Sequence, residues 1–181
     1  MTGTEVPQPH PSRLTPFDGH PAVVGIVPGQ PELVALTAAA WARAAGGATL
    51  YFAYVDPTRQ VVEELPDGSV RHVDLDPDTA DDSWQERARS MEAFLHDVVD
   101  PTGVPWELRY LAGRPDRALT HLARAVDAAV IVVGTRAPGV RQGIREFIDG
   151  SVAVQLAHHQ HRPVLVVPLR VVDWKAQLAW G

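Results

Sequence analysis

The sequence predicts an α/β fold, a doubly wound, five-stranded, mostly parallel sheet with helices on both faces. Three observations lead to this prediction. Apolar runs alternate with helical segments along the chain, the runs are apolar at almost every position, and turn residues separate them. Strands of that kind are buried on both faces, as in a parallel sheet covered by crossover helices. We therefore expect right-handed β-α-β connections.

Five strands and four helices alternate in the predicted order. Leu33, Leu36, Ala40 and Ala44 recur at helical spacing, and Ser83 with Glu86 forms the S-x-x-E capping box that begins a helix. The predicted strands are 22–27, 49–55, 106–111, 130–133 and 164–167, and the predicted helices are 32–45, 83 to about 100, 116–126 and one beginning at 150–151.

An additional β-hairpin is predicted near 61–76, inserted outside the main sheet. Two apolar β-rich runs flank Pro66-Asp67-Gly68 there, which is the signature of a tight turn between antiparallel strands.

Length and composition are those of one globular domain. The chain has 181 residues, 45% of them hydrophobic, which is enough for one core and too few for two ordinary domains. We expect a flexible Pro-rich segment at 1–20, the domain at 21–168 and an apolar tail at 169–181. The 16 basic and 22 acidic residues give a formal charge of −6, which argues against a nucleic-acid partner.

Cysteine is absent, so disulfides, thiolate catalysis and Cys-ligated metal sites are excluded. The first twenty residues contain no apolar run of the length that a signal peptide or a membrane span needs. We therefore expect a cytoplasmic protein with no membrane partner.

The candidate site lies where the strands end. Ligands of doubly wound sheets bind outside the carboxyl ends of the strands, and an apolar strand followed by a Gly-rich loop and a helix start presents backbone amides to a phosphate. The candidate nucleotide-binding or anion-binding residues are Val27, Pro28, Val55, Val133, Gly134, Thr135, Arg136, Gly139, Arg141, Gly150, Ser151 and Val152.

Three segments near the carboxyl end carry a family resemblance. They are VIVVGTR at 130–136, GSVA at 150–153 and HRPVLVVP at 161–168, and together they resemble the carboxyl half of a universal stress protein domain. The similarity extends over about 22–168. It implies the fold of the adenine nucleotide alpha hydrolases, a regulatory or stress-response role, and ATP or AMP as ligand, with Mg²⁺ only alongside a nucleotide.

The resemblance also implies a homodimer formed along the last strand, through Val164, Leu165, Val166 and Val167. The short apolar strand between two prolines agrees with this, because an unprotected strand edge favours pairing with a second copy.

The glycine loop departs from the family motif, G-x-x-G, nine residues, then G-[S/T]. Here four residues separate Gly134 from Gly139 and ten more precede Gly150-Ser151. The longer loop contains Pro138, which has no N–H to offer a phosphate, and Asp149, whose charge repels one.

Two further features bear on the ligand in opposite directions. Pro28 stands where nucleotide-binding relatives commonly carry an Asp, whereas Arg136, Arg141 and Arg145 can clamp phosphate oxygens. Two functions therefore stay open. One is a dimeric regulatory protein with a degenerate nucleotide or anion site, and the other is a structural or interaction module that works through its dimer and its hairpin.

No catalytic residue and no metal site are predicted. The nucleophile motif G-x-S-x-G is missing, so the chain is at most a weak ATPase. His158, His159 and His161 lie at the end of the last helix without acidic residues at ligand spacing, and we assign them to favourable interaction with the helix dipole.

Overall fold

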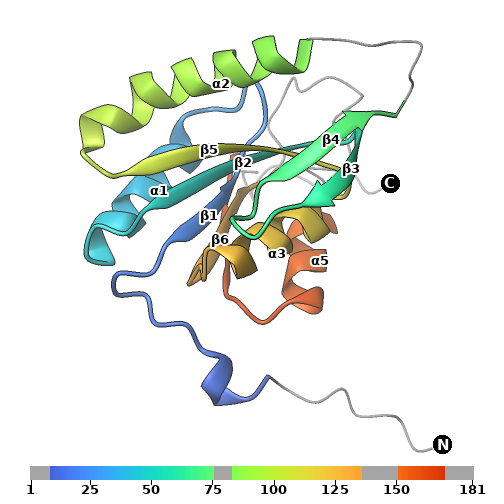
Figure 1. Ribbon diagram of the computed structural model, residues 1–181. Helices are drawn as coiled ribbons and strands as arrows, with labels where there is room; N and C mark the ends of the chain where they lie inside the picture. The colour runs from blue at the N-terminus through green and yellow to red at the C-terminus, as the bar shows by residue number, and fades with distance from the viewer. Residues whose placement is uncertain (1–8, 76–82, 136–150, 170–181) are drawn as a thin grey trace, which may run out of the picture.

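A five-stranded parallel sheet forms the centre of the molecule, with strand order β5-β2-β1-β6-β7 (Figure 1). The computed structural model describes residues 9–75, 83–135 and 151–169. The strands are β1 (Ala22–Gly25), β2 (Leu50–Asp56), β3 (Arg59–Glu64), β4 (Val70–Asp74), β5 (Trp106–Ala112), β6 (Val130–Gly134) and β7 (Val164–Val167). The helices are η1 (Pro11–Arg13), α1 (Leu33–Ala44), α2 (Ser83–Val99), η3 (Asp100–Thr102), α3 (Pro115–Ala125) and α5 (Ser151–His159). The predicted fold class is confirmed.

β1 lies at the middle of the sheet and pairs with β2 on one side and β6 on the other. Its first residue, Ala22, is in register with Leu50 of β2 and with Val130 of β6. All four residues of β1 and the first four of β6 are buried. Burial on both faces explains why these strands are continuously apolar instead of alternating.

Helices cover both faces of the sheet, with α1 and α2 on one side and α3 and α5 on the other (Figure 1). α1 packs on the strands through small residues, since Ala35, Ala38 and Ala42 are fully or almost fully buried. Leu33 and Leu36, whose spacing helped to predict this helix, are 47% and 38% exposed and lie on its outer side. Alanine allows the helix backbone to approach the sheet closely, so the small residues and not the leucines form the inner face.

The hairpin predicted near 61–76 is confirmed as an antiparallel pair, β3 and β4, separate from the main sheet. In its turn, Asp67 Oδ1 accepts hydrogen bonds from the Ser69 backbone N–H (3.0 Å) and hydroxyl (2.6 Å). Gly68 has φ +82°, and a Cβ there would lie 2.5 Å from Leu122 Cδ1 of α3. The tip of the hairpin therefore rests directly on α3.

Part of the segment before β1 contacts the domain. The ring of Phe17 meets Trp41 of α1 edge-on, with 5.7 Å between centroids, and the Gly19 N–H donates to the Ala45 carbonyl (2.9 Å).

Across the residues that the structure describes, no helix is both long enough and apolar enough to cross a membrane.

Candidate functional site

A cavity of about 500 Å³ lies at the carboxyl end of β1, between the loop that follows this strand and the helix α2. Strand order reverses at β1, because β2 and β5 lie on one side of it and β6 and β7 on the other. Ligands of open α/β sheets bind at such a switch point, and the volume is within the range of small-molecule sites. The lining residues are Ile26, Val27, Pro28, Gly29, Gln30, Ser83, Glu86, Arg87, Ser90, Met91 and Phe94.

The loop after β1 is held by Gln30. The Val27 N–H donates to Gln30 Oε1 (3.0 Å), and the Gln30 N–H donates to the Val27 carbonyl (3.2 Å). This loop lies against the end of β6, where a Cβ on Gly134 would be 2.7 Å from Gln30 Nε2 and 2.9 Å from Val34 Cγ2. A larger residue at 134 would therefore displace the side chains of Gln30 and Val34.

A buried carboxylate, Asp56, ends β2 beside the cavity. The side chain is 2% exposed, and its Oδ2 accepts from Arg87 Nη1 (2.7 Å) and the Tyr110 hydroxyl (2.5 Å). Its Oδ1 accepts from the backbone N–H (2.9 Å) and hydroxyl (2.6 Å) of Thr58. Arg87 also donates to the Tyr110 oxygen (2.6 Å). Two residues of the sheet, Asp56 and Tyr110, therefore hold the guanidinium of Arg87, which lines the cavity.

These contacts decide the ionisation of the network. Burial alone would raise the pKa of Asp56, but hydrogen bonds from Thr58 and Tyr110 and the charge of Arg87 outweigh it, and the pKa is lowered. Burial and the neighbouring Asp56 raise the pKa of Tyr54 to about 12, and they also raise the pKa of Tyr110. At neutral pH the network holds one carboxylate, one guanidinium and neutral tyrosines.

The hairpin covers the outer side of this network. Arg59 of β3 is buried, donates from Nε to His72 Nδ1 (2.7 Å), forms an ion pair with Asp74 and lies 5.4 Å over the Trp84 ring. The His72 ring in turn lies 5.6 Å from Tyr110. Burial and the adjacent Arg59 lower the pKa of His72, in agreement with its acceptor role toward Arg59.

The described residues that line the cavity come only from the loop after β1 and from α2. Hairpin residues therefore do not contribute to its walls. They cover the ends of β2 and β5, beside which β3 and β4 lie in Figure 1.

Among the residues predicted for a site, Val27 and Pro28 line the cavity. Val55 and Val133 are buried inside their strands. Thr135 is tied to the last strand, because its N–H donates to the Val167 carbonyl (2.8 Å) and its Oγ1 accepts from the Leu169 N–H (2.7 Å).

Most of the candidate residues in the second half of the glycine loop lie outside the described part of the chain. Val152 is buried in α5, which begins at Ser151. Arg136, Gly139, Arg141 and Gly150 lie outside the described residues, as do Pro138, Arg145 and Asp149. The predicted contact of Arg136, Gly139, Arg141 and Gly150 with a ligand stays a prediction.

Sequence reasoning did not identify Gln30, Asp56, Arg87 and Tyr110 as site residues. Asp56 directly follows Val55, a candidate site residue at the end of a predicted strand, so a charged residue at a strand end was the available signal. Nothing local distinguished Arg87 or Tyr110 from other residues of their helix and strand. Within the described part of the chain, no three His, Asp or Glu side chains gather in a way that could hold a metal ion.

Comparison with known proteins identifies a family. The model of the universal stress protein family matches residues 20–168. A universal stress protein from Archaeoglobus fulgidus is similar in structure, with a TM-score of 0.57, 23% identity, and coverage of 82% of this chain and 98% of that chain. A member of the family from Burkholderia pseudomallei has a TM-score of 0.58 and 22% identity, covering 83% of this chain and 96% of its own.

Two further similar structures contain a bound nucleotide. One is the universal stress protein from Archaeoglobus fulgidus in complex with dAMP, with a TM-score of 0.56, 22% identity, and coverage of 82% and 97% of the two chains. The other is a universal stress protein in complex with cAMP, with a TM-score of 0.53, 22% identity, and coverage of 84% and 99%. No curated protein sequence matches the chain. At these identities, the structural likeness shows a common fold.

Proposed function

This chain belongs to the universal stress protein family, and from that premise we propose that it binds an adenine nucleotide, ATP or AMP, in the cavity at the end of β1. We propose that it acts as a dimeric, cytoplasmic regulatory protein of a stress response. The observation that carries the nucleotide proposal is a ligand-sized cavity at the topological switch point of the sheet.

The chemistry of the cavity walls supports a nucleotide. Ile26, Met91 and Phe94 provide apolar surface on which a base can lie, and sulfur and aromatic groups suit a flat ring. Arg87 supplies a guanidinium whose side chain is 32% exposed although it is paired with Asp56. A guanidinium of this kind binds phosphate oxygens through directed N–H groups.

The polar residues of α2 supply hydrogen-bonding groups that suit the sugar and base of a nucleotide. Ser83, Glu86 and Ser90 lie along the cavity side of this helix, where hydroxyl and carboxylate oxygens can bind ribose hydroxyls or an exocyclic amine. The dAMP and cAMP complexes of similar proteins are adenine mononucleotide complexes, which supports the same class of ligand here. In this proposal Mg²⁺ enters only with the nucleotide.

We propose binding without a defined reaction, with weak ATPase activity as the upper limit. Asp56, the buried carboxylate beside the cavity, accepts hydrogen bonds at both oxygens, from Thr58 at one and from Tyr110 and Arg87 at the other. A carboxylate that is held in this way is poorly placed to accept a proton from an attacking water.

The nucleotide proposal is tested by filling the cavity from α2. Ser90 is an exposed residue of the cavity wall, so Ser90→Phe places a ring in the binding volume without disturbing the core. AMP, ADP and ATP, each with and without Mg²⁺, are titrated by calorimetry and by thermal shift. A nucleotide at a hundredfold excess over its Kd should add about 2.7 kcal/mol to the unfolding free energy of the wild type.

The matched control is Ala93→Phe, which adds the same ring to an exposed position of α2 that does not line the cavity. We expect Ser90→Phe to abolish the nucleotide-dependent stabilisation and Ala93→Phe to retain it. The proposal fails if no adenine nucleotide stabilises the wild type, or if both variants respond like the wild type.

A second candidate function is an interaction module of the same fold that does not use a nucleotide. It is favoured by the exposed apolar side chains of the hairpin, where Val62 is 62% and Val73 44% exposed. Failure of every nucleotide in the titrations above would favour this candidate.

A further inference from the structure

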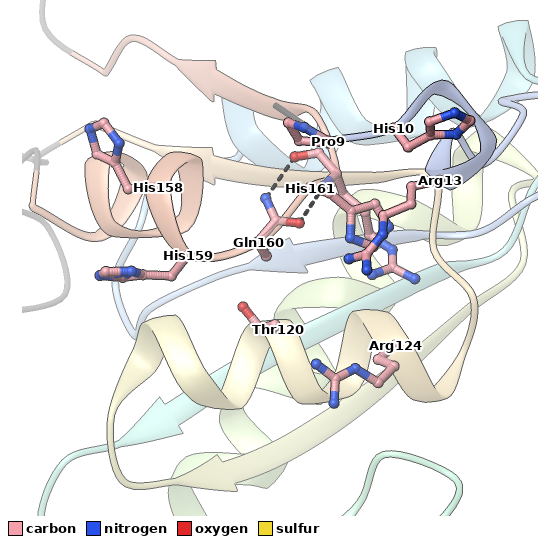
Figure 2. A pocket seen from close by; sticks show the side chains of 10 residues that line it. Pro9, His10, Arg13, Thr120, Arg124, His158, His159, Gln160 and His161 are labelled. Atoms are coloured by element: carbon pink, nitrogen blue, oxygen red, sulfur yellow. Dashed lines mark hydrogen bonds between the residues drawn. The ribbon is translucent and has the colours of Figure 1, made fainter. Parts of the chain in front are cut away.

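A second cavity, of about 700 Å³, lies at the opposite end of the sheet, where β6 and β7 begin (Figure 2). Its walls come from three parts of the chain that are distant in sequence. The segment around η1 contributes one part, the carboxyl-terminal half of α3 a second, and the end of α5 with the turn before β7 a third. It shares no lining residue with the cavity at the end of β1.

The described lining of this cavity, the basic cavity, consists mostly of arginine and histidine side chains. It contains three arginines and four histidines and includes no carboxylate. The lining residues are Pro9, His10, Arg13, Thr120, Arg124, His158, His159, Gln160, His161 and Arg162. In Figure 2, His158 and His159 lie at the end of the cavity away from Arg13, so they form its rim and not the site of charge convergence.

Arg162 is built into the cavity wall. Only 9% of the residue is exposed, and its Nε donates to the Ala128 carbonyl (2.6 Å). The Arg162 backbone N–H donates to Gln160 Oε1, and Gln160 Nε2 donates to the Arg162 carbonyl (2.6 Å each). The carboxylate partner of Arg162, Asp127 Oδ1, is 3.7 Å from Nη2 and belongs to a side chain that is 67% exposed. A pair of that length and exposure compensates little of a buried guanidinium's charge.

The charges of Arg13 and Arg124, like that of Arg162, act on the His161 ring. Burial lowers the pKa of His161, and the charges of Arg162, Arg13 and Arg124 lower it further. Burial also lowers the pKa of Arg162, and Arg124 lowers it further while Asp127 opposes the change. Three guanidinium groups from three parts of the chain line the same cavity as the His161 ring, and repulsion among these positive groups favours an anion between them.

We infer that the basic cavity binds a small polyvalent phosphate, an anion with two or more linked phosphoryl groups, held by Arg13, Arg124 and Arg162. Guanidinium groups bind phosphoryl oxygens through paired N–H groups, and three of them from separate elements match an anion with several oxygens. The volume exceeds the needs of a single phosphate. The net charge of −6 and the size of the cavity favour a small anion over a nucleic acid.

The first test uses inorganic pyrophosphate with the full chain, by calorimetry at constant ionic strength. We expect pyrophosphate to bind with one-to-one stoichiometry. A titration with NaCl at the same ionic strength should give no binding heat. Arg124→Ala should weaken binding at least tenfold, and because Arg124 is exposed, this variant should fold normally. The matched control is Arg43→Ala, at an exposed arginine of α1 that does not line the cavity, and it should bind like the wild type.

A second readout locates the anion. In proton NMR titrations, bound pyrophosphate should raise the pKa of the His161 ring, because the anion offsets the three guanidinium charges. Ser90→Phe, which blocks the cavity at the end of β1, should leave pyrophosphate binding unchanged. This inference is therefore independent of the proposed nucleotide function.

Three results would overturn the inference. The first is the absence of pyrophosphate binding or of any change at His161. The second is equal binding by the wild type and Arg124→Ala, or loss of binding in Ser90→Phe, either of which places the anion elsewhere. The third is binding of a single-stranded oligonucleotide without binding of pyrophosphate, which would assign the cavity to nucleic acid.

Discussion

Asp56 shows how a single charged residue is accommodated at the end of an apolar strand. Its carboxylate is nearly inaccessible to solvent, yet its pKa is lowered, because Thr58, Tyr110 and Arg87 supply more stabilisation than burial removes. A lowered folded pKa contributes stability above the unfolded value of about 3.9, and this contribution is lost as pH falls through the folded pKa. The same carboxylate orients Arg87 toward the cavity.

We predict that Asp56→Asn lowers the free energy of unfolding by about 2 kcal/mol at pH 7, because it removes the charge that pairs with Arg87. The difference from the wild type should stay constant down to about pH 5 and shrink below about pH 4, as the wild-type carboxylate becomes protonated. Urea denaturation from pH 7 to pH 3 measures it. Asp97→Asn, at an exposed carboxylate of α2, is the control and should show little change at any pH. A difference that grows toward low pH would contradict the assignment.

Contacts of this kind set the limit of sequence reasoning at the residue scale. Arg87 and Tyr110 lie 31 and 54 positions from Asp56, so their meeting depends on how α2 and β5 pack against β2. Gly134 could be predicted as the glycine that ends a strand, because the apolar run before it is a local signal. The close approach of the Gln30 and Val34 side chains to Gly134 could not be predicted, because they come from another loop and a helix.

At the scale of elements, the hairpin is the part that departs most from the plain alternation of strands and helices. Its turn residues predicted it, but its docking could not be predicted, because Gly68 meets α3 through contacts with Leu122 and Ala125. Local signals such as the capping box at Ser83 and the spacing of Leu33 and Leu36 predicted helices that the structure contains. The buried face of α1 was not evident, because its alanines carry a weaker hydrophobic pattern than its exposed leucines.

We predict that Gly68→Ala destabilises the protein more than Gly103→Ala, by about 1–3 kcal/mol. Both glycines have positive φ, +82° and +70°, so both substitutions carry similar backbone strain. Only at Gly68 would the new methyl group overlap a buried neighbour, since nothing lies within 4 Å of a Cβ at Gly103. Chemical denaturation of the two variants measures the difference. Equal losses would show that the hairpin tip does not pack on α3 in solution.

At the scale of the whole molecule, the sheet has unequal edges. β5 pairs with β2 along seven positions and contacts the hairpin, whereas β7 is short and ends the described sheet on the other side. Val166 of β7 is 42% exposed, and Val167 is almost fully buried within its own protomer. The proposed dimer therefore depends on the outward-facing residues of this strand and not on all four.

We predict that Val166→Lys converts the proposed dimer into monomers, because a charged side chain at the centre of a strand-to-strand interface costs desolvation energy. Sedimentation equilibrium of the full chain measures the change in mass. Leu36→Lys replaces an apolar residue of similar exposure (38%) on α1 and should leave the oligomeric state unaltered. A wild type that is monomeric at all concentrations would refute the dimer.

The central position of β1 has a consequence for how the chain folds as it is made. Of the described strands, β1 leaves the ribosome first, but its partner on one side, β6, follows only after β2, the hairpin, α2, β5 and α3. Until β6 emerges, a fully apolar strand has one open edge, where a nascent chain can pair wrongly or aggregate. The fold is thus most vulnerable during synthesis, and it completes its sheet only when the last third of the chain arrives.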